Sequence, residues 1–532
     1  MRRDEDDTLC FARAFWQVVQ RAPEPTSAQA SAGLASVNGS PPGPTGSSPL
    51  VPDRLTCQPT PGLSRLNTAR GLRSTLGALL TLPGWNGPLY TVAMYPWIEL
   101  TGASPFALRY SSLLCGLLAV PLTYVLGRRL LGSPVGLAGA ALVALSPHLV
   151  WYSQEAKMYA AILALALLAI YALRRAVDQT STVSKDFVRL RWWGLMVLAT
   201  TLALYTHILM AQLIPLLVVL GLIWWPRMRQ HRAGALVGLA LLTLPYLPLL
   251  AWQGRTWLLP PGQATLFNIG RLDAMLEATL DAWGGHFVGE PWATLILIGL
   301  SLLALFGLTL VWLTDQEQQG QGGDSEGLLA GWREPAALLT WMFLPLLGIW
   351  LISARQPIFT HRYLVWAAPA LYLSAAAGVA ALLRLGRAGA LAGAGLCLVV
   401  LLGDGRALVY QATQPIKPDF QAAAAYLERR YAAGDLIVFH LSYMADNYDY
   451  YFDGPFDGWG APAPAGGWSE SDVDVSMRTN TSGRSTVWLV LSESDMWDPR
   501  GLIKAWLDAH AVAPPEEQPF THVSVFRYQL VQ

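Results

Sequence analysis

The chain has 532 residues, of which 53% are hydrophobic and only 14% are charged. Soluble domains carry about a quarter charged residues, so this composition excludes an ordinary soluble protein. The formal net charge is zero and no basic stripe is present, which argues against a nucleic-acid partner. Charged residues are scarcest between Ala103 and Asp404. We therefore predict an α-helical polytopic membrane protein with a soluble C-terminal domain.

The first 102 residues are predicted to form a separate N-terminal region. Residues 22–62 are rich in Pro, Ser, Gly, Ala and Thr, which is typical of a flexible loop. The piece 88–100 contains Pro96 and Glu99 and is too short to span a bilayer, so we expect a helix lying at the membrane surface. Cys10 and Cys57 could pair if this region is extracytoplasmic.

Residues 103–404 are predicted to hold about ten membrane spans. A span needs about 20 apolar residues, or about 17 at the short end. The predicted segments are 106–127, 134–152, 158–174, 192–206, 208–225, 234–252, 292–313, 335–353, 363–383 and 388–404. The segments 192–206 and 208–225 run together around His207.

Basic residues divide the connections between these spans into two alternating sets. The richer set contains Arg128, Arg129, Arg174, Arg175, Lys185, Arg189, Arg191, Arg227, Arg229, Arg232, Arg333, Arg384 and Arg387. The poorer set contains Lys157, Arg255, Arg271, Arg355 and Arg362. The positive-inside rule assigns the richer set to the cytoplasm. The N-terminal region, the loops 253–291 and 354–362, and the C-terminal domain are then predicted to be extracytoplasmic.

This orientation places the N-terminus outside with no span before it. We expect that a preceding span is missing from the sequence. The alternative is a short N-terminal tail that crosses the membrane unaided.

Residues 405–532 alternate between helical and extended patterns. Helices are predicted from Asp419 to Arg430 and from Leu502 to His510. Strands are predicted at 435–440, 486–492 and 522–528. Such alternation is typical of a small α/β domain.

Ionisable residues beside membrane spans are expensive to bury, so they are candidates for function. Glu155 and Lys157 lie two residues apart in a connection that has no turn residue. Arg355, His361 and Arg362 form a second cluster. Two arginines near the membrane surface suit an anionic phosphate, and the alternative is simple snorkelling to the interface.

Two further features are weaker when taken alone. His207 lies at an apolar turn, where a buried structural histidine would also fit. The acidic run that contains Asp4 and Glu5 would usually be a solvated tail.

Several stretches together resemble the bacterial glycosyltransferase 39 family. Its relatives are the protein O-mannosyltransferases and the lipid A aminoarabinose transferase. The stretches are WNGPLY at 85–90, FALRY at 106–110, GRRLLG at 127–132, ALSP at 144–147, WYSQEAKMY at 151–159, HRY at 361–363 and KPDF at 417–420. The resemblance implies a GT-C membrane fold of about ten helices at 103–404, followed by the α/β domain at 405–532.

The resemblance also implies an enzyme, a hexosyl- or pentosyltransferase in the inner (plasma) membrane. Such enzymes transfer a sugar, with inversion, from a polyprenyl-phosphate donor to a hydroxyl of a lipid, glycan or protein acceptor outside the cytoplasm. The leaving lipid phosphate can be stabilised by Arg or Lys, so no metal or other cofactor is required; a divalent metal is compatible with this chemistry but is not indicated.

The family's site residues are carried over by motif. Asp4 in the Arg3-Asp4-Glu5 motif would be the general base, with Glu5 as its acidic neighbour. The expected donor-phosphate ligands are Lys157, Arg355 and Arg362, and the expected pocket residues are Asn86, Glu155, His207, His361 and Tyr363.

The sequence departs from the family pattern in three places. Position 157 is Lys where many members have Arg, which keeps the charge without the planar fork. Position 86 is Asn, where many members have another residue before two prolines. The first membrane helix of the family is absent ahead of Asp4.

A membrane transporter or flippase for a lipid or saccharide is the non-enzymatic alternative. Such proteins usually place ionisable groups near the bilayer midplane and often consist of repeated halves. Neither feature is evident in this sequence.

Overall fold

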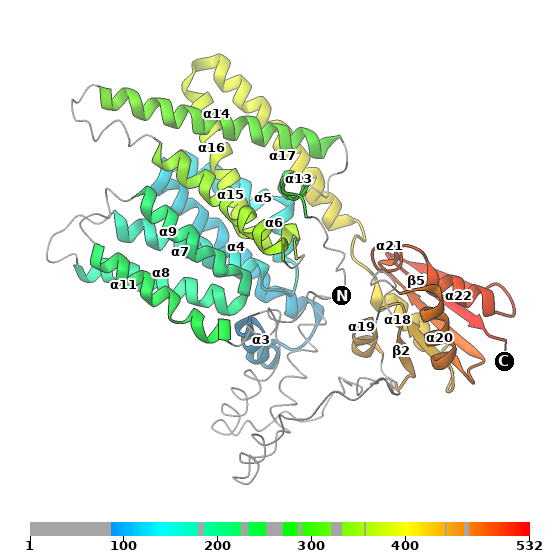
Figure 1. The fold of residues 1–532 in the computed structure, drawn as a ribbon. Coiled ribbons are helices and arrows are strands. Elements are labelled where there is room, and N and C mark those ends of the chain that lie inside the picture. The colour runs from blue at the N-terminus through cyan, green and yellow to red at the C-terminus, as the bar shows by residue number, and fades with distance from the viewer. Residues whose placement is uncertain are drawn as a thin grey trace, which may run out of the picture.

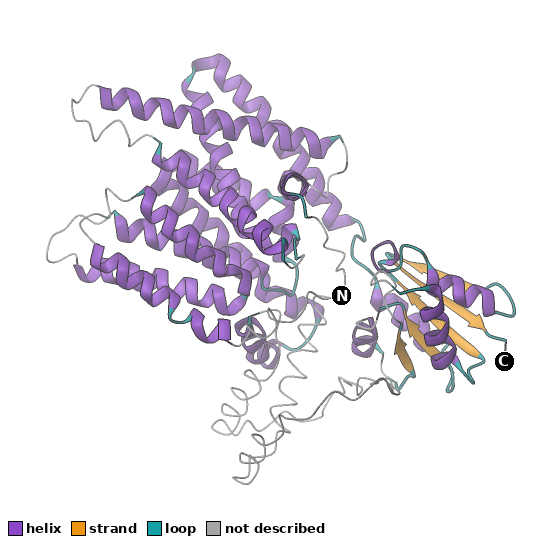
Figure 2. Cartoon of the chain, viewed as in Figure 1, coloured by secondary structure: helices purple, strands orange, loops and turns teal. Residues whose placement is uncertain are grey.

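The computed structural model describes residues 87–178, 186–224, 232–251, 270–285, 289, 291–320, 332–355, 358–441, 444–452, 454–461 and 468–531. Helices make up a large bundle, and a sheet covered by helices forms a smaller body at the C-terminal end (Figure 1). Figure 2 shows all strands that are drawn within this smaller body. The predicted residues Asp4, Glu5, Cys10, Cys57 and Asn86 lie outside the described residues.

The helix bundle follows the predicted apolar segments in chain order. Its elements are α3 (Pro88–Thr101), α4 (Pro105–Leu131), α5 (Ser133–Leu145), α6 (Pro147–Ser153), α7 (Tyr159–Val177), α8 (Asp186–Thr206), the 3-10 helix η2 (Ile208–Gln212), α9 (Leu213–Ile223), α11 (Arg232–Thr243), α13 (Leu272–Gly285), α14 (Trp292–Gly320), α15 (Arg333–Ser353), the 3-10 helix η5 (His361–Ala367), α16 (Ala368–Arg384) and α17 (Gly386–Thr413). The last helix runs to Thr413, past the predicted domain boundary at 404.

In the described part of the chain, six helices are long and apolar enough to cross a membrane, and the bent pair α5–α6 would be a seventh. The other predicted spans form helices that are not both long enough and apolar enough to be counted among these. Segment 192–206 lies within α8, whereas 208–225 and 234–252 form shorter apolar helices. The protein is thus a multi-pass membrane protein.

Helix ends in the bundle follow from local sequence. Ser104 accepts a hydrogen bond from the amide of Ala107 and so caps α4, which has Pro105 in its first turn. Gly132, with φ of 97°, ends α4 in a backbone region that favours glycine. Ser146 and Pro147 then end α5 and begin α6, and the chain bends by 61° between them.

Ion pairs join helix ends that belong to the basic connections. Nε of Arg129 lies 2.8 Å from Oδ2 of Asp178, and Nη2 of Arg174 lies 2.9 Å from Oε1 of Glu334. Arg174 and Glu334 are both largely shielded from solvent, and the indole of Trp224 donates to Glu334 as well. The first pair links α4 to the residue after α7, and the second links α7 to α15.

The pair α14 and α16 packs most closely through glycines. A Cβ atom on Gly378 would lie 2.0 Å from the carbonyl oxygen of Leu303, and one on Gly307 would lie 2.3 Å from the amide of Gly378. Small residues let membrane helices approach until their backbones touch. These two glycines therefore set the distance between α14 and α16.

The C-terminal body is a five-stranded mixed sheet with the order β2-β1-β3-β5-β4. Its elements are α18 (Phe420–Glu428), β1 (Leu436–Phe439), α19 (Met444–Tyr451), β2 (Gly458–Gly460), α20 (Glu470–Thr481), β3 (Thr486–Leu491), α21 (Ser494–Trp497), α22 (Leu502–His510), β4 (Glu516–Phe520) and β5 (Val523–Gln529). Strand β1 is parallel to β2 and β3, and β5 is antiparallel to β3 and β4.

Two apolar layers cover the sheet. On one face, α18 and α19 pack on side chains such as Phe439 and Trp488. On the other face, α20 and α22 pack on side chains such as Val438 and Leu489. Neighbouring residues of a strand point to opposite faces, so each strand serves both layers.

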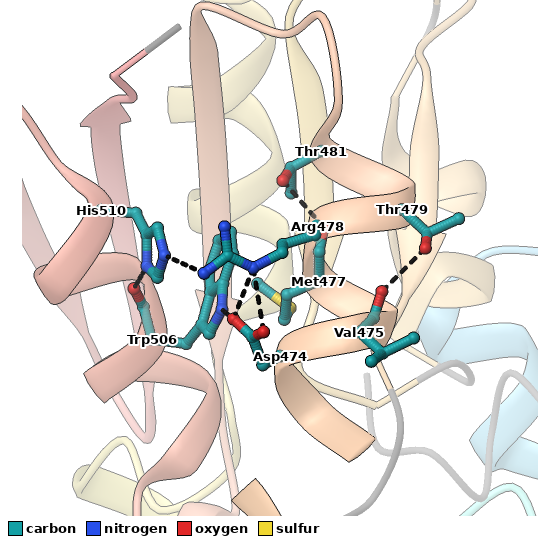
Figure 3. Close-up of polar contacts among 8 residues, drawn as sticks. All are labelled: Asp474, Val475, Met477, Arg478, Thr479, Thr481, Trp506 and His510. Carbon is teal, nitrogen blue, oxygen red and sulfur yellow. Dashed lines mark hydrogen bonds and ion pairs between the residues drawn. The ribbon is translucent and has the colours of Figure 1, made fainter. Parts of the chain in front are cut away.

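Polar contacts join α20 to α22 on the second face (Figure 3). Asp474 accepts hydrogen bonds from the indole of Trp506 and from Nε of Arg478, at 2.7 and 2.9 Å. Nη2 of Arg478 lies 3.3 Å from Nε2 of His510, whose ring stacks on Trp506. The hydrogen bond from Arg478 lowers the pKa of Asp474. This cluster is far from the helices α18 and α19 because the sheet lies between them.

Candidate functional site

The connection between α6 and α7 carries both charged residues of the first predicted cluster. Glu155 is completely buried and Lys157 is 6% exposed, although neither lies in a helix. The amide of Lys157 donates to the carbonyl of Glu155 at 2.7 Å, which makes a tight turn. Burial of a carboxylate and an ammonium group costs free energy unless each has partners, so both groups require polar partners at this site.

The 3-10 helix η5 brings the second predicted cluster next to this connection. Its residues pack against α7, whose first residue is Tyr159. The guanidinium of Arg362 lies 5.8 Å from the centre of the Tyr159 ring and 5.7 Å from that of Tyr363. These distances are typical of a cation held over aromatic faces. Arg362 is thus placed beside the α6–α7 connection despite the distance along the chain.

His207 completes the group from the end of α8. Its ring lies 5.1 Å from Tyr363 and 6.4 Å from Tyr159, centre to centre. Nδ1 accepts a hydrogen bond from the amide of Leu209 at 3.2 Å, and this bond begins η2. The neutral ring therefore carries its proton on Nε2, where it can donate.

His207 lies close enough to Arg362 and Lys157 for their positive charges to affect its pKa. Its pKa is lowered to about 3, first by burial and then by the positive charges of Arg362 and Lys157. His207 is therefore neutral at ordinary pH. The site consequently has two positive side chains close to one neutral hydrogen-bond donor, which is a suitable lining for an anionic oxygen.

Three residues of this region were missed in the sequence. The hydroxyl of Tyr152 lies 3.2 Å from Nε2 of His361, and the fully buried His148 lies against both rings. Tyr159 touches His207 and Tyr363. Their positions on either side of Glu155 and Lys157 in the sequence could have indicated a role in the site. Aromatic side chains next to a membrane span, however, usually serve only in packing.

Not every predicted residue joins the group. Arg355 is exposed, and its backbone amide donates to the carbonyl of Ile352 at 3.1 Å, but its side chain forms no hydrogen bond or ion pair with a residue that the structure describes. Asp4, Glu5 and Asn86 lie outside the described residues, so their predicted roles remain predictions. Within the described ranges, no three His, Cys, Asp or Glu side chains lie together in a way that could hold a metal ion.

Residues 87–252 match the family model described as dolichyl-phosphate-mannose-protein mannosyltransferase. The segment contains α3 to α11, and so includes Glu155, Lys157 and His207. None of the proteins with a curated function matches the chain.

The structure is also similar to solved structures. The oligosaccharyltransferase of Archaeoglobus fulgidus in its apo form has a TM-score of 0.50 at 10% identity, and the match covers 80% of this chain and 63% of that one. ArnT from Cupriavidus metallidurans in the apo state has a TM-score of 0.49 at 13% identity, covering 83% of this chain and 87% of that one. The same ArnT bound to undecaprenyl phosphate has a TM-score of 0.49 at 13% identity, covering 83% and 88%.

This chain has the GT-C glycosyltransferase fold. The family resemblance drawn from the sequence and the predicted fold class are both confirmed. In this GT-C protein the family segment ends within the bundle, so η5 with Arg362 and the whole C-terminal α/β domain lie beyond it.

Proposed function

We propose that this protein transfers a sugar from a polyprenyl-phosphate donor to an acceptor hydroxyl, with inversion, on the extracytoplasmic side of the inner membrane. The acceptor is a lipid, a glycan or a protein, and the sugar is a hexose or a pentose. The observation that carries the proposal is the meeting of Lys157, Arg362 and neutral His207 around Tyr159 and Tyr363.

The cations give this group its proposed role as the donor-phosphate site. A polyprenyl phosphate leaves with a negative charge on its oxygens as the glycosidic bond breaks. Lys157, which is buried, and Arg362, which is half-buried, would stabilise that charge more than solvated cations would. His207 would donate from Nε2 to the same phosphate.

The acceptor half of the reaction is assigned to the N-terminal acidic pair. Asp4, next to Glu5, takes the proton of the acceptor hydroxyl while its oxygen attacks the anomeric carbon. The bond from that carbon to the phosphate oxygen breaks on the opposite face, and the electron pair stays on the phosphate. The attack from the opposite face inverts the configuration. Glu155, Asn86, His361 and Tyr363 would line the pocket, and Arg355 is proposed to meet the phosphate on its solvent side.

The orientation is part of the proposal. The basic residues Arg129 and Arg174 lie at bundle ends held by ion pairs to Asp178 and Glu334, which belong to the connections assigned to the cytoplasm. Arg174 lies near the C-terminal end of α7, whereas the α6–α7 connection adjoins its N-terminal end. The site therefore lies at the opposite end of the bundle from these ion pairs.

The test is an assay of the purified full-length protein with defined polyprenyl-phosphate sugars. Asp4→Asn should abolish sugar release and transfer while expression is unchanged. Asp7→Asn, in the same acidic run, is the matched control and should keep activity. Full activity of Asp4→Asn would remove Asp4 as the base. Movement of the lipid across vesicles without any sugar transfer would instead support a flippase.

A further inference from the structure

The five-residue connection 154–158 between α6 and α7 is held both by the bundle and by the C-terminal part of the chain. From the bundle, Ser112 on α4 donates its hydroxyl to the carbonyl of Lys157 at 2.8 Å, and Tyr90 on α3 lies 3.2 Å from the same hydroxyl. These bonds fix the backbone at Lys157. Other contacts hold the residues that precede Lys157 in the connection.

The chain leading into the C-terminal domain holds the start of the connection. Nζ of Lys417 donates to the carbonyl of Gln154 at 3.2 Å. The same ammonium group lies 4.8 Å from the centre of the Trp151 ring on α6. Lys417 thus bridges α6 and the connection through a cation–π contact and a hydrogen bond.

Helix α19 of the C-terminal domain packs against the apolar cluster that contains Ala156, the middle residue of the connection. Tyr450 and Tyr451 pack in one apolar cluster with Met94, Leu108 and Ala156. Ala156 is completely buried there, between Glu155 and Lys157 in sequence. The hydroxyl of Tyr450 donates to the carbonyl of Ala103 at 2.6 Å, and the two tyrosine rings meet edge to face at 4.7 Å.

These contacts have a simple geometric consequence. Gln154 and Ala156 flank Glu155, and Ala156 is bonded to Lys157. A movement of α19 or of Lys417 therefore moves the backbone that carries both charged side chains. Displacements of about 1 Å at a site can change reaction rates by about a hundredfold, even when the altered residue is remote.

We propose that Tyr450, Tyr451 and Lys417 are positioning residues for Glu155 and Lys157, so that the phosphate site is complete only while the C-terminal domain is docked on the connection. This inference rests on the proposed function for the part that concerns the phosphate. The contacts themselves concern the shape of the connection and do not depend on that function.

The test uses the full-length protein with Tyr450→Phe combined with Tyr451→Ala. Tyr426→Phe is the matched control, because its hydroxyl bonds to Glu516 within the C-terminal domain. A second control is Trp506→Phe, in the α20–α22 cluster on the opposite face of the sheet (Figure 3). The probe is undecaprenyl phosphate in detergent micelles. Its dissociation constant should rise about three- to tenfold in the double variant and stay unchanged in both controls.

A second measurement separates positioning from general unfolding. Amide hydrogen exchange should become faster in residues 154–158 of the double variant, with the melting temperature and the exchange of the sheet unchanged. Unchanged exchange in 154–158, or equal effects in the controls, would overturn the inference. Wild-type protein that neither binds the probe nor transfers sugar would overturn the proposed function, and the exchange result would still decide whether α19 positions the connection.

Discussion

The hydroxyl of Tyr152 lies 3.2 Å from Nε2 of His361, across 209 residues of sequence. Tyr152 stands on α6, directly before the connection that carries Glu155 and Lys157, and His361 opens η5, directly before Arg362. One hydrogen bond thus ties together the two segments that supply the cations. The first prediction follows from this bond.

Replacing Tyr152 with Phe should lower sugar transfer about fivefold, because the loss of one hydrogen bond lets η5 move relative to α6. The transfer rate is measured at a saturating concentration of acceptor and at varied concentrations of donor. The KM for the donor should rise. Tyr410→Phe, on the exposed side of α17, is the control and should behave as wild type. A Tyr152→Phe variant with wild-type donor KM would show that the pair does not hold the site.

The charge of Lys157 should matter more than its shape. Lys157→Ala is expected to weaken undecaprenyl phosphate binding about ten- to a hundredfold, the usual loss for a charge-assisted hydrogen bond. Lys157→Arg keeps the charge and should retain most of the affinity. Titration calorimetry in micelles measures both. Equal losses for Ala and Arg would point to packing rather than charge.

The glycine contact between α14 and α16 should tolerate no side chain. Gly378→Ala places a methyl group 2.0 Å from the Leu303 carbonyl oxygen, so the helices must separate. Overpacking of this kind costs about 1–3 kcal/mol, which should lower the melting temperature in detergent. Gly395→Ala on α17 is the control, because a Cβ there meets nothing within 4 Å. Equal melting temperatures for the two variants would contradict the packing argument.

Stability of the C-terminal domain should depend on His440. This residue follows β1, is completely buried, and donates from Nδ1 to the carbonyl of Ser492 at 3.2 Å. Burial lowers the pKa of His440 below its ordinary value of 6.5, and the opposing effect of Asp498, 4.0 Å from Nε2, is smaller. In the unfolded chain the ring takes up a proton at higher pH than in the folded domain.

The sign of the pH effect follows from that difference. Below about pH 6.5 the unfolded state binds more protons than the folded state. The contribution of His440 to the free energy of unfolding is therefore full at higher pH and is lost as the pH falls. Hydrogen exchange of β1 and β3 should therefore be faster at about pH 5.5 than at about pH 7.5. His440→Gln should flatten this dependence, whereas His510→Gln, on the surface of α22, should leave it intact. An unchanged pH dependence in His440→Gln would remove His440 as its source.

Much of the fold followed from local patterns. The α7 segment reads as a span because its apolar residues are continuous, and β3 reads as a strand because Thr486 to Leu491 are β-branched, aromatic or apolar. In the C-terminal domain, the helices α19, α20 and α21 and the strands β2 and β4 were missed. Helix α19 contains many polar and aromatic residues, and β2 has two glycines among its three residues, so neither carries a periodic signal.

The candidate site was likewise predicted only in part from the sequence. Glu155, Lys157, His361 and Arg362 were predicted from charge beside apolar segments, and His207 only through the family resemblance. The structure brings these residues to one end of the bundle. Arg355 carried the same signal but lies exposed in the turn directly after α15, outside the group. Local charge cannot indicate on which side of such a turn a side chain will lie.

The sequence by itself determined that this is a membrane protein with an α/β tail, and which polar residues stand at the span ends, because hydropathy and charge act over neighbouring residues. Only the tertiary structure decided which of those residues meet. The bond between Tyr152 and His361, and the packing of Tyr450 and Tyr451 against the cluster that contains Ala156, join segments far apart along the chain. Such contacts depend on how helices pack against one another, and no local pattern records that packing.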